Sequence, residues 1–119
     1  RKDILQKVGG MDVELRSAQD YDLWLKVSLE GSLAFVPKCL SRYILRDGSI
    51  SSNPGLRFNC SLKVIKKHRS RVSLGQYLHR ILLVHYEALT MFKAKKDILG
   101  MAWLLSSLPF RLAKLGVSR

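Results

Sequence analysis

The feature that most constrains the fold is an apolar stripe at helical spacing in the second half of the chain. Leu78, Leu82, His85, Leu89 and Phe92 recur every three or four residues, which is the spacing of one helix face. The stripe follows Ser73-Leu74-Gly75-Gln76, a sequence of capping-box form. The pattern therefore predicts a long helix that begins at Ser73 and continues through Phe92.

Four further helices are expected from similar signals. The first is expected over residues 2–8, closed by the left-handed turn that Gly9-Gly10 favours, and the second over about 20–30, closed by Gly31. The third begins after Asn53-Pro54. The fourth is expected from about 95 through 105, and Pro109 kinks or ends it. Phe58, Leu62 and Ile65 share a face of the helix after Pro54, but alternation from 56 to 64 also permits a strand there.

Between these helices two runs are typical of strands. Residues 33–36 and 39–45 are rich in aliphatic and aromatic side chains and are divided by Pro37-Lys38, and residues 47–53 are a loop. Strands combined with helices predict an α/β arrangement in the first half of the chain, followed by a helical second half.

Positive charge is concentrated in the second half. Residues 1–56 hold 8 basic and 7 acidic residues, whereas residues 57–119 hold 13 basic and 2 acidic residues. The densest basic run spans residues 63–71, and it is accompanied by no helix-turn-helix, RNA-binding or zinc-finger signature. One hypothesis for this half is therefore a basic helical module that binds nucleic acid or an anionic membrane surface. The missing signatures make nucleic acid the less expected partner, and a membrane surface is the other, because basic residues flank an uncharged segment, residues 98–108. This segment is too short to span a bilayer, and it is either an interfacial helix or a core helix.

Cysteine and histidine usage excludes several classes of site. Cys39 and Cys60 form no ligand cluster with the three histidines, so no metal site is expected in this chain. Two isolated cysteines fit a reduced compartment, although a disulfide between them stays open. The chain starts with Arg1 and shows no signal-peptide pattern, so we expect it to be the tail of a longer protein.

Two carboxylates at the start of a helix are the candidate chemical groups. Asp20 and Asp22 are two residues apart, so they point to different sides of a helix and at most one of them acts in catalysis. Acidic residues in a first helical turn are usually caps or partners of the helix dipole. Composition and spacing alone therefore favour a structural role for both.

Residues 1–52 nevertheless resemble the C-terminal part of the catalytic domain of family 2 glycosyltransferases. That family carries, in order, "vGGfde", "EDydLwlRl", two strands with "vp" between them, and "YRxHxxSxS". The corresponding stretches of this chain follow the same order: Arg1, VGGMDVEL at 8–15, AQDYDLWLKVSLEG at 18–31, AFVPKCLSRY at 34–43 and RDGSISS at 46–52. The resemblance implies an α/β fragment of the GT-A fold over residues 1–52 and a basic helical extension over residues 53–119.

The resemblance also implies an activity and a set of site residues. Asp20 matches the general base that deprotonates the acceptor hydroxyl, in an inverting transfer of sugar from a nucleotide-sugar donor to a glycan or lipid-linked acceptor. Four further residues would border the substrates: Gly9, Gly10, Met11 and Gln19. The family's metal, Mg or Mn, would have its ligands outside this chain, which alone is expected to be inactive. The implied location is cytoplasmic, peripheral at the cytoplasmic face of the membrane.

Three departures from the family pattern change what these residues could do. Gln19 stands where Glu is commoner, and it keeps a hydrogen-bonding side chain. Lys26 replaces the usual Arg, which removes a bidentate contact. Arg46 stands where the family often has His, and Ile44 where it has Arg. A guanidinium cannot ligate a cation, so Arg46 is predicted to contact the donor diphosphate directly.

Overall fold

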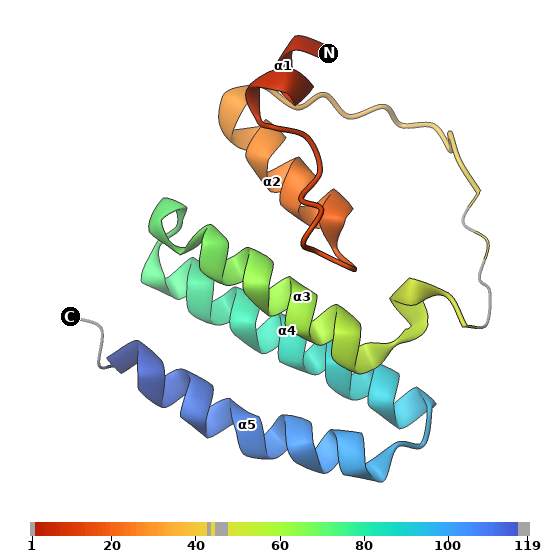
Figure 1. Ribbon diagram of the computed structural model, residues 1–119, viewed down its shortest axis with the longest axis vertical. Coiled ribbons are helices and arrows are strands. Elements are labelled where there is room, and N and C mark those ends of the chain that lie inside the picture. The colour runs from red at the N-terminus through yellow and green to blue at the C-terminus, as the bar shows by residue number, and fades with distance from the viewer. Residues whose placement is uncertain (1, 43, 45–47, 117–119) are drawn as a thin grey trace.

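The computed structural model describes residues 2–42, 44 and 48–116, and that part of the chain is helical without any strand. Its elements, in order, are α1 (Lys2–Lys7), α2 (Gln19–Glu30), the 3-10 turn η1 (Ile50–Ser52), α3 (Pro54–Lys67), the 3-10 turn η2 (Arg69–Arg71), α4 (Leu74–Ala94) and α5 (Ile98–Gly116) (Figure 1). The helices expected from the sequence are all present, with ends within a few residues of those predicted, apart from the longer α5.

Helices α3, α4 and α5 lie side by side and enclose the main core (Figure 1). The core consists of Phe58, Leu62 and Ile65 of α3, Tyr77, Ile81, Val84, Ala88 and Phe92 of α4, and Leu104 of α5. The predicted face of α3 is therefore confirmed, because all three of its predicted residues are buried. Helix α3 also contacts α5, where the rings of Phe58 and Trp103 meet edge to face at 5.8 Å.

The start signals of α3 and α4 act as the sequence predicted. The side chain of Asn53 accepts a hydrogen bond from the backbone N–H of Leu56 at 3.0 Å, with Pro54 in the first turn. Ser73 and Gln76 form the reciprocal capping box of α4. Each cap satisfies backbone N–H groups that have no partner within the helix. The strand alternative for residues 56–64 is wrong.

The buried face of α4 differs from the predicted stripe by one position. Tyr77, Ile81, Val84 and Ala88 are buried, whereas Leu82 is 50% exposed. His85 and Phe92 belong to both sets, and both are buried. A shift of one residue turns the helix by about 100°. Two adjacent apolar rows therefore compete on α4, and contact with α3 and α5 determines which one is buried.

The α/β prediction for residues 1–52 is wrong. Residues 33–36 and the described part of 39–45 are extended but pair with no other strand in the described chain. The backbone N–H of Lys38 donates to the carbonyl of Val36 at 2.8 Å, so the chain makes a tight turn around Pro37. This is not the two-residue turn that joins hairpin strands, which favours Asn-Gly or Gly-Gly. The remaining described segments are helices or loops, so no partner strand is available.

The extended segment makes the molecule wider than a compact domain of this length. The Cα radius of gyration is 16.2 Å, against about 13.5 Å for a compact domain of 119 residues. Residues 32–42 are exposed throughout and arc away from the helices in Figure 1. Leu33 and Phe35 are 70% and 89% exposed. The apolar residues that suggested strands therefore face solvent.

Helix α5 continues beyond the predicted end. Pro109 lies inside the helix, which extends to Gly116. Within the described chain, no helix is both long and apolar enough to cross a membrane.

Candidate functional site

The loop after α1 depends on two glycines in the left-handed region. Gly9 has φ +74° and Gly10 has φ +67°, and the N–H of Gly10 donates to the carbonyl of Leu5 at 3.0 Å. Residues other than glycine are strained at such backbone angles, because they carry a Cβ atom. The predicted left-handed end of α1 is therefore confirmed. A Cβ at either position would meet no atom within 4 Å, so the space beside this turn is open to a ligand.

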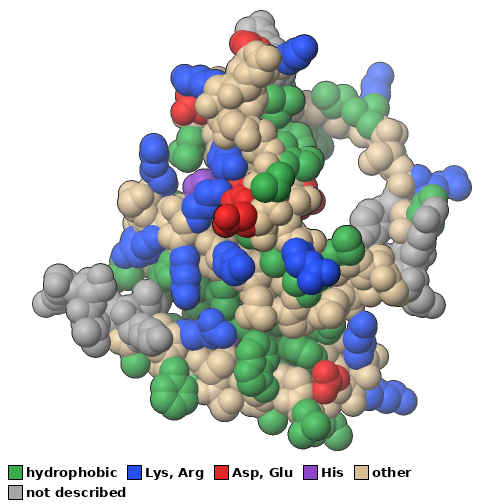
Figure 2. Space-filling model, viewed as in Figure 1, with side chains coloured by type: hydrophobic (Ala, Val, Ile, Leu, Met, Phe, Trp, Pro, Cys, Tyr) green, Lys and Arg blue, Asp and Glu red, His purple; other side chains and the backbone are tan. Residues whose placement is uncertain are grey.

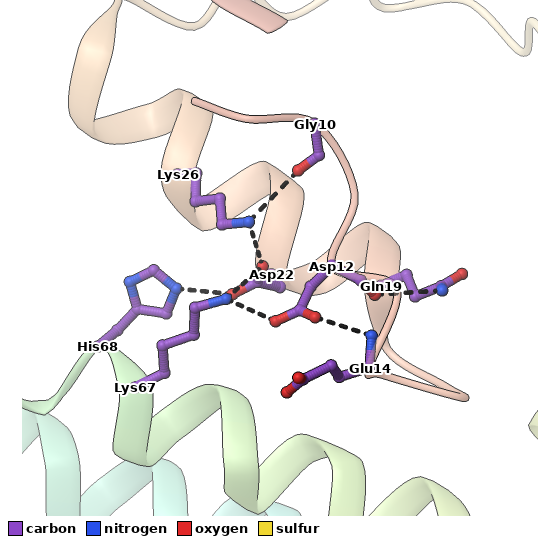
Figure 3. Close-up of polar contacts among 8 residues, drawn as sticks. All are labelled: Gly10, Asp12, Glu14, Gln19, Asp22, Lys26, Lys67 and His68. Carbon is purple, nitrogen blue, oxygen red and sulfur yellow. Dashed lines mark hydrogen bonds and ion pairs between the residues drawn. The ribbon is translucent and has the colours of Figure 1, made fainter. Parts of the chain in front are cut away.

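Two hydrogen bonds hold the next part of this loop along α2. Lys26 donates through Nζ to the carbonyl of Gly10 at 3.3 Å, and Gln19 donates through Nε2 to the carbonyl of Asp12 at 3.2 Å (Figure 3). The loop therefore runs antiparallel to the helix, with Gly10 beside its middle and Asp12 beside its start.

A buried ionic cluster joins this unit to α3. We define the Asp22 cluster as Asp12, Asp22, Lys26, Lys67 and His68 (Figure 3). The Asp22 side chain is fully buried, with Oδ2 2.7 Å from Lys26 Nζ and 3.2 Å from Lys67 Nζ, and with Oδ1 2.9 Å from His68 Nε2. Lys67 Nζ also lies 2.7 Å from Asp12 Oδ2. One carboxylate thus connects α2 with the C-terminal end of α3.

The cluster keeps Asp22 ionised. Burial raises the pKa of Asp22, but hydrogen bonds from Lys26, His68 and Lys67 outweigh burial and bring the pKa down to about 2. The hydrogen bond from Lys67 and the backbone N–H of Glu14 lower the pKa of Asp12. Such a carboxylate is a weak base, so Asp22 is suited to holding the helices together rather than to accepting protons.

Asp20 has different surroundings. It lies in the first turn of α2 and is exposed, and its Oδ1 accepts a hydrogen bond from the backbone N–H of Tyr21 at 2.8 Å. No ion pair joins it to another residue of the described chain. The two carboxylates that the sequence placed on different sides of one helix therefore differ in burial and in pairing.

The predicted site residues are only partly brought together. Gln19 and Asp20 are adjacent at the start of α2, but the amide nitrogen of Gln19 is used to hold the loop. Gly10 lies beside Lys26, which follows Asp20 by six residues in α2. Six residues correspond to a rise of about 9 Å along the helix, so Gly10 lies beside a different part of α2 from Asp20. Gly9 belongs to the same turn, and Met11 is 55% exposed. Arg46 lies outside the described residues.

Lys67 and His68 are the site residues that sequence reasoning missed. Both belong to the basic run of residues 63–71, in which nothing singles them out from the other cations. The spacing of Asp22 and Lys26, four residues apart on a helix, signals their pairing. No local pattern signals the contacts with Lys67 and His68, which are 45 and 46 residues away from Asp22.

The described residues do not form a metal site. They contain no group of three or more His, Cys, Asp or Glu side chains that could hold a metal ion. Both carboxylates of the Asp22 cluster are paired with lysine. The resemblance places the ligands of the family's Mg or Mn outside this chain.

Comparison with known proteins adds no relative: no family model, no curated protein and no solved structure matches the chain.

Proposed function

We propose that the chain is part of a family 2 type glycosyltransferase and contributes helical segments beside the acceptor. The support is the ordered series of motif-like stretches between Arg1 and Ser52, because five short stretches in one order are more specific than any of them alone. The described part of the chain contributes helices and no sheet.

Asp20 is the general base of this proposal. The observation that carries it is that Asp20 is the exposed carboxylate of α2 without an ion pair in the described chain, whereas Asp22 is buried among three cationic or donor groups. The acceptor oxygen forms a bond to the anomeric carbon of the donor sugar. The bond from that carbon to the diphosphate oxygen breaks, and the hydroxyl proton passes to Asp20. The products are the glycosylated acceptor and a nucleoside diphosphate.

The substrates follow from this chemistry. The donor is a nucleotide sugar, and the acceptor is a glycan or a lipid-linked hydroxyl, in polysaccharide or glycolipid synthesis. The open turn at Gly9 and Gly10 would border the acceptor, and Arg46 would contact the diphosphate. We place the reaction in the cytoplasm at the inner face of the membrane, supported by the excess of basic residues after Arg57.

The experiment measures transfer by the whole encoded protein, and by the 119-residue chain alone. A panel of radiolabelled nucleotide sugars is incubated with envelope glycan and lipid extracts, with release of nucleoside diphosphate as a second readout. We expect transfer by the whole protein, none by this chain alone, and a loss of about 10²–10⁴-fold in D20N. D3N makes the same change at an exposed first-turn position of α1 and serves as the control. Absence of transfer from every donor would contradict the proposal.

A further inference from the structure

Between Ile98 and Ala113, the exposed positions of α5 are almost entirely apolar. Ten positions in this range are exposed, and Ser106 is the polar exception. The apolar ones are Ile98, Leu99, Ala102, Trp103, Leu105, Pro109, Phe110, Leu112 and Ala113. Leu99 is 84% exposed and Phe110 is 73% exposed. A solvated helix face normally carries charged and polar residues.

These ten positions form one continuous surface, which we call the outer arc of α5. At 3.6 residues per turn they cover about half of the helix circumference. The opposite side carries Leu104, which is 1% exposed in the core, and Met101, which packs against that core. Most of the outer arc therefore faces away from α3 and α4, with Trp103 at its edge, where the ring also meets Phe58, and no other element of the described chain covers the arc.

Basic residues lie at one end of the outer arc. Lys93, Lys95 and Lys96 are exposed at the turn between α4 and α5, and no ion pair joins them to an acidic group of the described chain. Arg111 lies on the inner flank of α5, with its guanidinium 5.1 Å from the ring centre of Phe58. The sequence of α5 contains no Asp or Glu. In Figure 2, hydrophobic side chains gather over α5, and Lys and Arg side chains gather above it, over α3 and α4.

This combination identifies one occupant. A helix with an apolar face and basic residues nearby, which is not both long and apolar enough to cross a membrane, is the form that lies in the interfacial plane of a bilayer. A second copy of the chain carries the same net charge of +12, and the repulsion between two such copies opposes their association. An anionic lipid surface satisfies both the apolar arc and the positive charge beside it.

We propose that the outer arc of α5 docks on an anionic lipid bilayer, with Leu99, Trp103 and Phe110 inserted between the headgroups. The lysines at the α4–α5 turn then lie within reach of the lipid phosphates. This inference depends on α5 and its surroundings, and it is independent of the proposed sugar transfer.

The experiment is co-sedimentation of the full chain with vesicles of phosphatidylcholine, with and without phosphatidylglycerol. L99E and F110E place a charge in the outer arc without changing a buried residue, and we expect each to weaken binding by about tenfold or more. V13E and F35E make the same change at positions that are each 89% exposed and lie outside α5, and these controls should bind like the unchanged chain. K93Q and K95Q should each weaken binding about fivefold.

A second readout follows the tryptophan in the arc. In a W24F background, Trp103 emission should shift to the blue with anionic vesicles and remain unchanged with phosphatidylcholine alone. Equal binding of L99E, F110E and their controls would overturn the proposal, as would indifference to anionic lipid. A dimer that L99E converts to monomer, with vesicle binding unchanged, would instead make the arc a contact between copies and would also overturn it.

Discussion

His68 Nε2 lies 2.9 Å from Oδ1 of Asp22, and the two residues are 46 positions apart in the sequence. The contact joins the first turn of α2 to the residue that ends α3. Asp22 is fully buried and His68 is 13% exposed. The first half of the chain, which contains the candidate chemistry, is therefore tied to the basic second half by a polar contact shielded from water.

Removing this carboxylate should destabilise the protein. In D22N the hydrogen bonds from Lys26, Lys67 and His68 lose their charged acceptor, and we expect a loss of about 2 kcal/mol in the free energy of unfolding. D20N, which changes an exposed carboxylate on the same helix, should change it by less than about 0.5 kcal/mol. Urea unfolding followed by circular dichroism measures both. Equal free energies of unfolding for D22N and D20N would contradict the role of the Asp22 cluster.

The same carboxylate predicts a loss of stability in acid. Its pKa is about 2 in the folded chain and about 3.9 when unfolded. The folded-state pKa is the lower one, so the stabilisation is complete well above pH 4 and is lost as the pH falls toward 2. The difference corresponds to about 2–3 kcal/mol. Unfolding free energies from pH 6 to pH 2 measure this loss, and in D22N the loss should be smaller by that amount. An unchanged acid dependence in D22N would show that other groups cause it.

Titration of His85 should make the free energy of unfolding depend on pH in a second, higher pH range. It is 6% exposed; Nδ1 lies 2.7 Å from the carbonyl of Ile81, and Nε2 is buried without a hydrogen-bond partner in the described chain. Burial, together with the charge of Arg111, lowers its pKa below the usual 6.5, although the bond to Ile81 opposes this. The unfolded chain therefore binds the proton first, and stability falls as the pH drops below about 6.5.

The variant H85L tests this effect. Leucine removes both the titration and the buried nitrogen without a partner, while the backbone N–H of residue 85 still bonds to the Ile81 carbonyl within the helix. We expect the free energy of unfolding at pH 7 to stay within about 1 kcal/mol of the parent. The decrease in the free energy of unfolding between pH 7 and pH 5 should be smaller in H85L than in the parent. If the fall were as steep as in the parent, His85 would not be its source.

Substitution by alanine should have opposite effects on stability at two glycines, Gly100 and Gly75. A Cβ at Gly100 would lie 2.4 Å from ring atoms of Phe92 and 2.6 Å from a carboxylate oxygen of Asp97. Phe92 is buried and cannot move freely, so G100A should destabilise the protein by about 1–3 kcal/mol. At Gly75, in the first turn of α4, a Cβ meets nothing within 4 Å. G75A should therefore be neutral or stabilising by up to about 1 kcal/mol. Thermal unfolding compares the two variants, and a G100A protein as stable as the parent would refute the close approach of α4 and α5.

Local signals in the sequence predicted the helices well. The Asn53-Pro54 start, the Ser73–Gln76 box and the glycine turn after α1 depend on residues within a few positions of one another, and all three are present. The strands could not be predicted reliably in the same way, because a strand exists only where a second strand pairs with it. Leu33 and Phe35 have the composition of a strand but lack that partner in the described chain.

The candidate site was predictable to a similar extent. The position of Asp20 and Asp22 on one helix start, and the pairing of Asp22 with Lys26, follow from helix geometry. The contacts of Asp22 with Lys67 and His68 depend on how α2 crosses α3, and the sequence carries no local signal for that. The buried row of α4 likewise depends on which of two apolar rows meets α3 and α5. Tertiary packing therefore decides both features.

We propose separate roles for Asp20 and Asp22, Asp20 in proton transfer and Asp22 in joining the helices. The most direct measurement compares D20N and the parent in the whole encoded protein, with the sugar transfer rate and the free energy of unfolding determined on the same samples. In D20N we expect a transfer rate at least about 10²-fold lower, with the free energy of unfolding within about 0.5 kcal/mol of the parent. An unchanged transfer rate in D20N would contradict it.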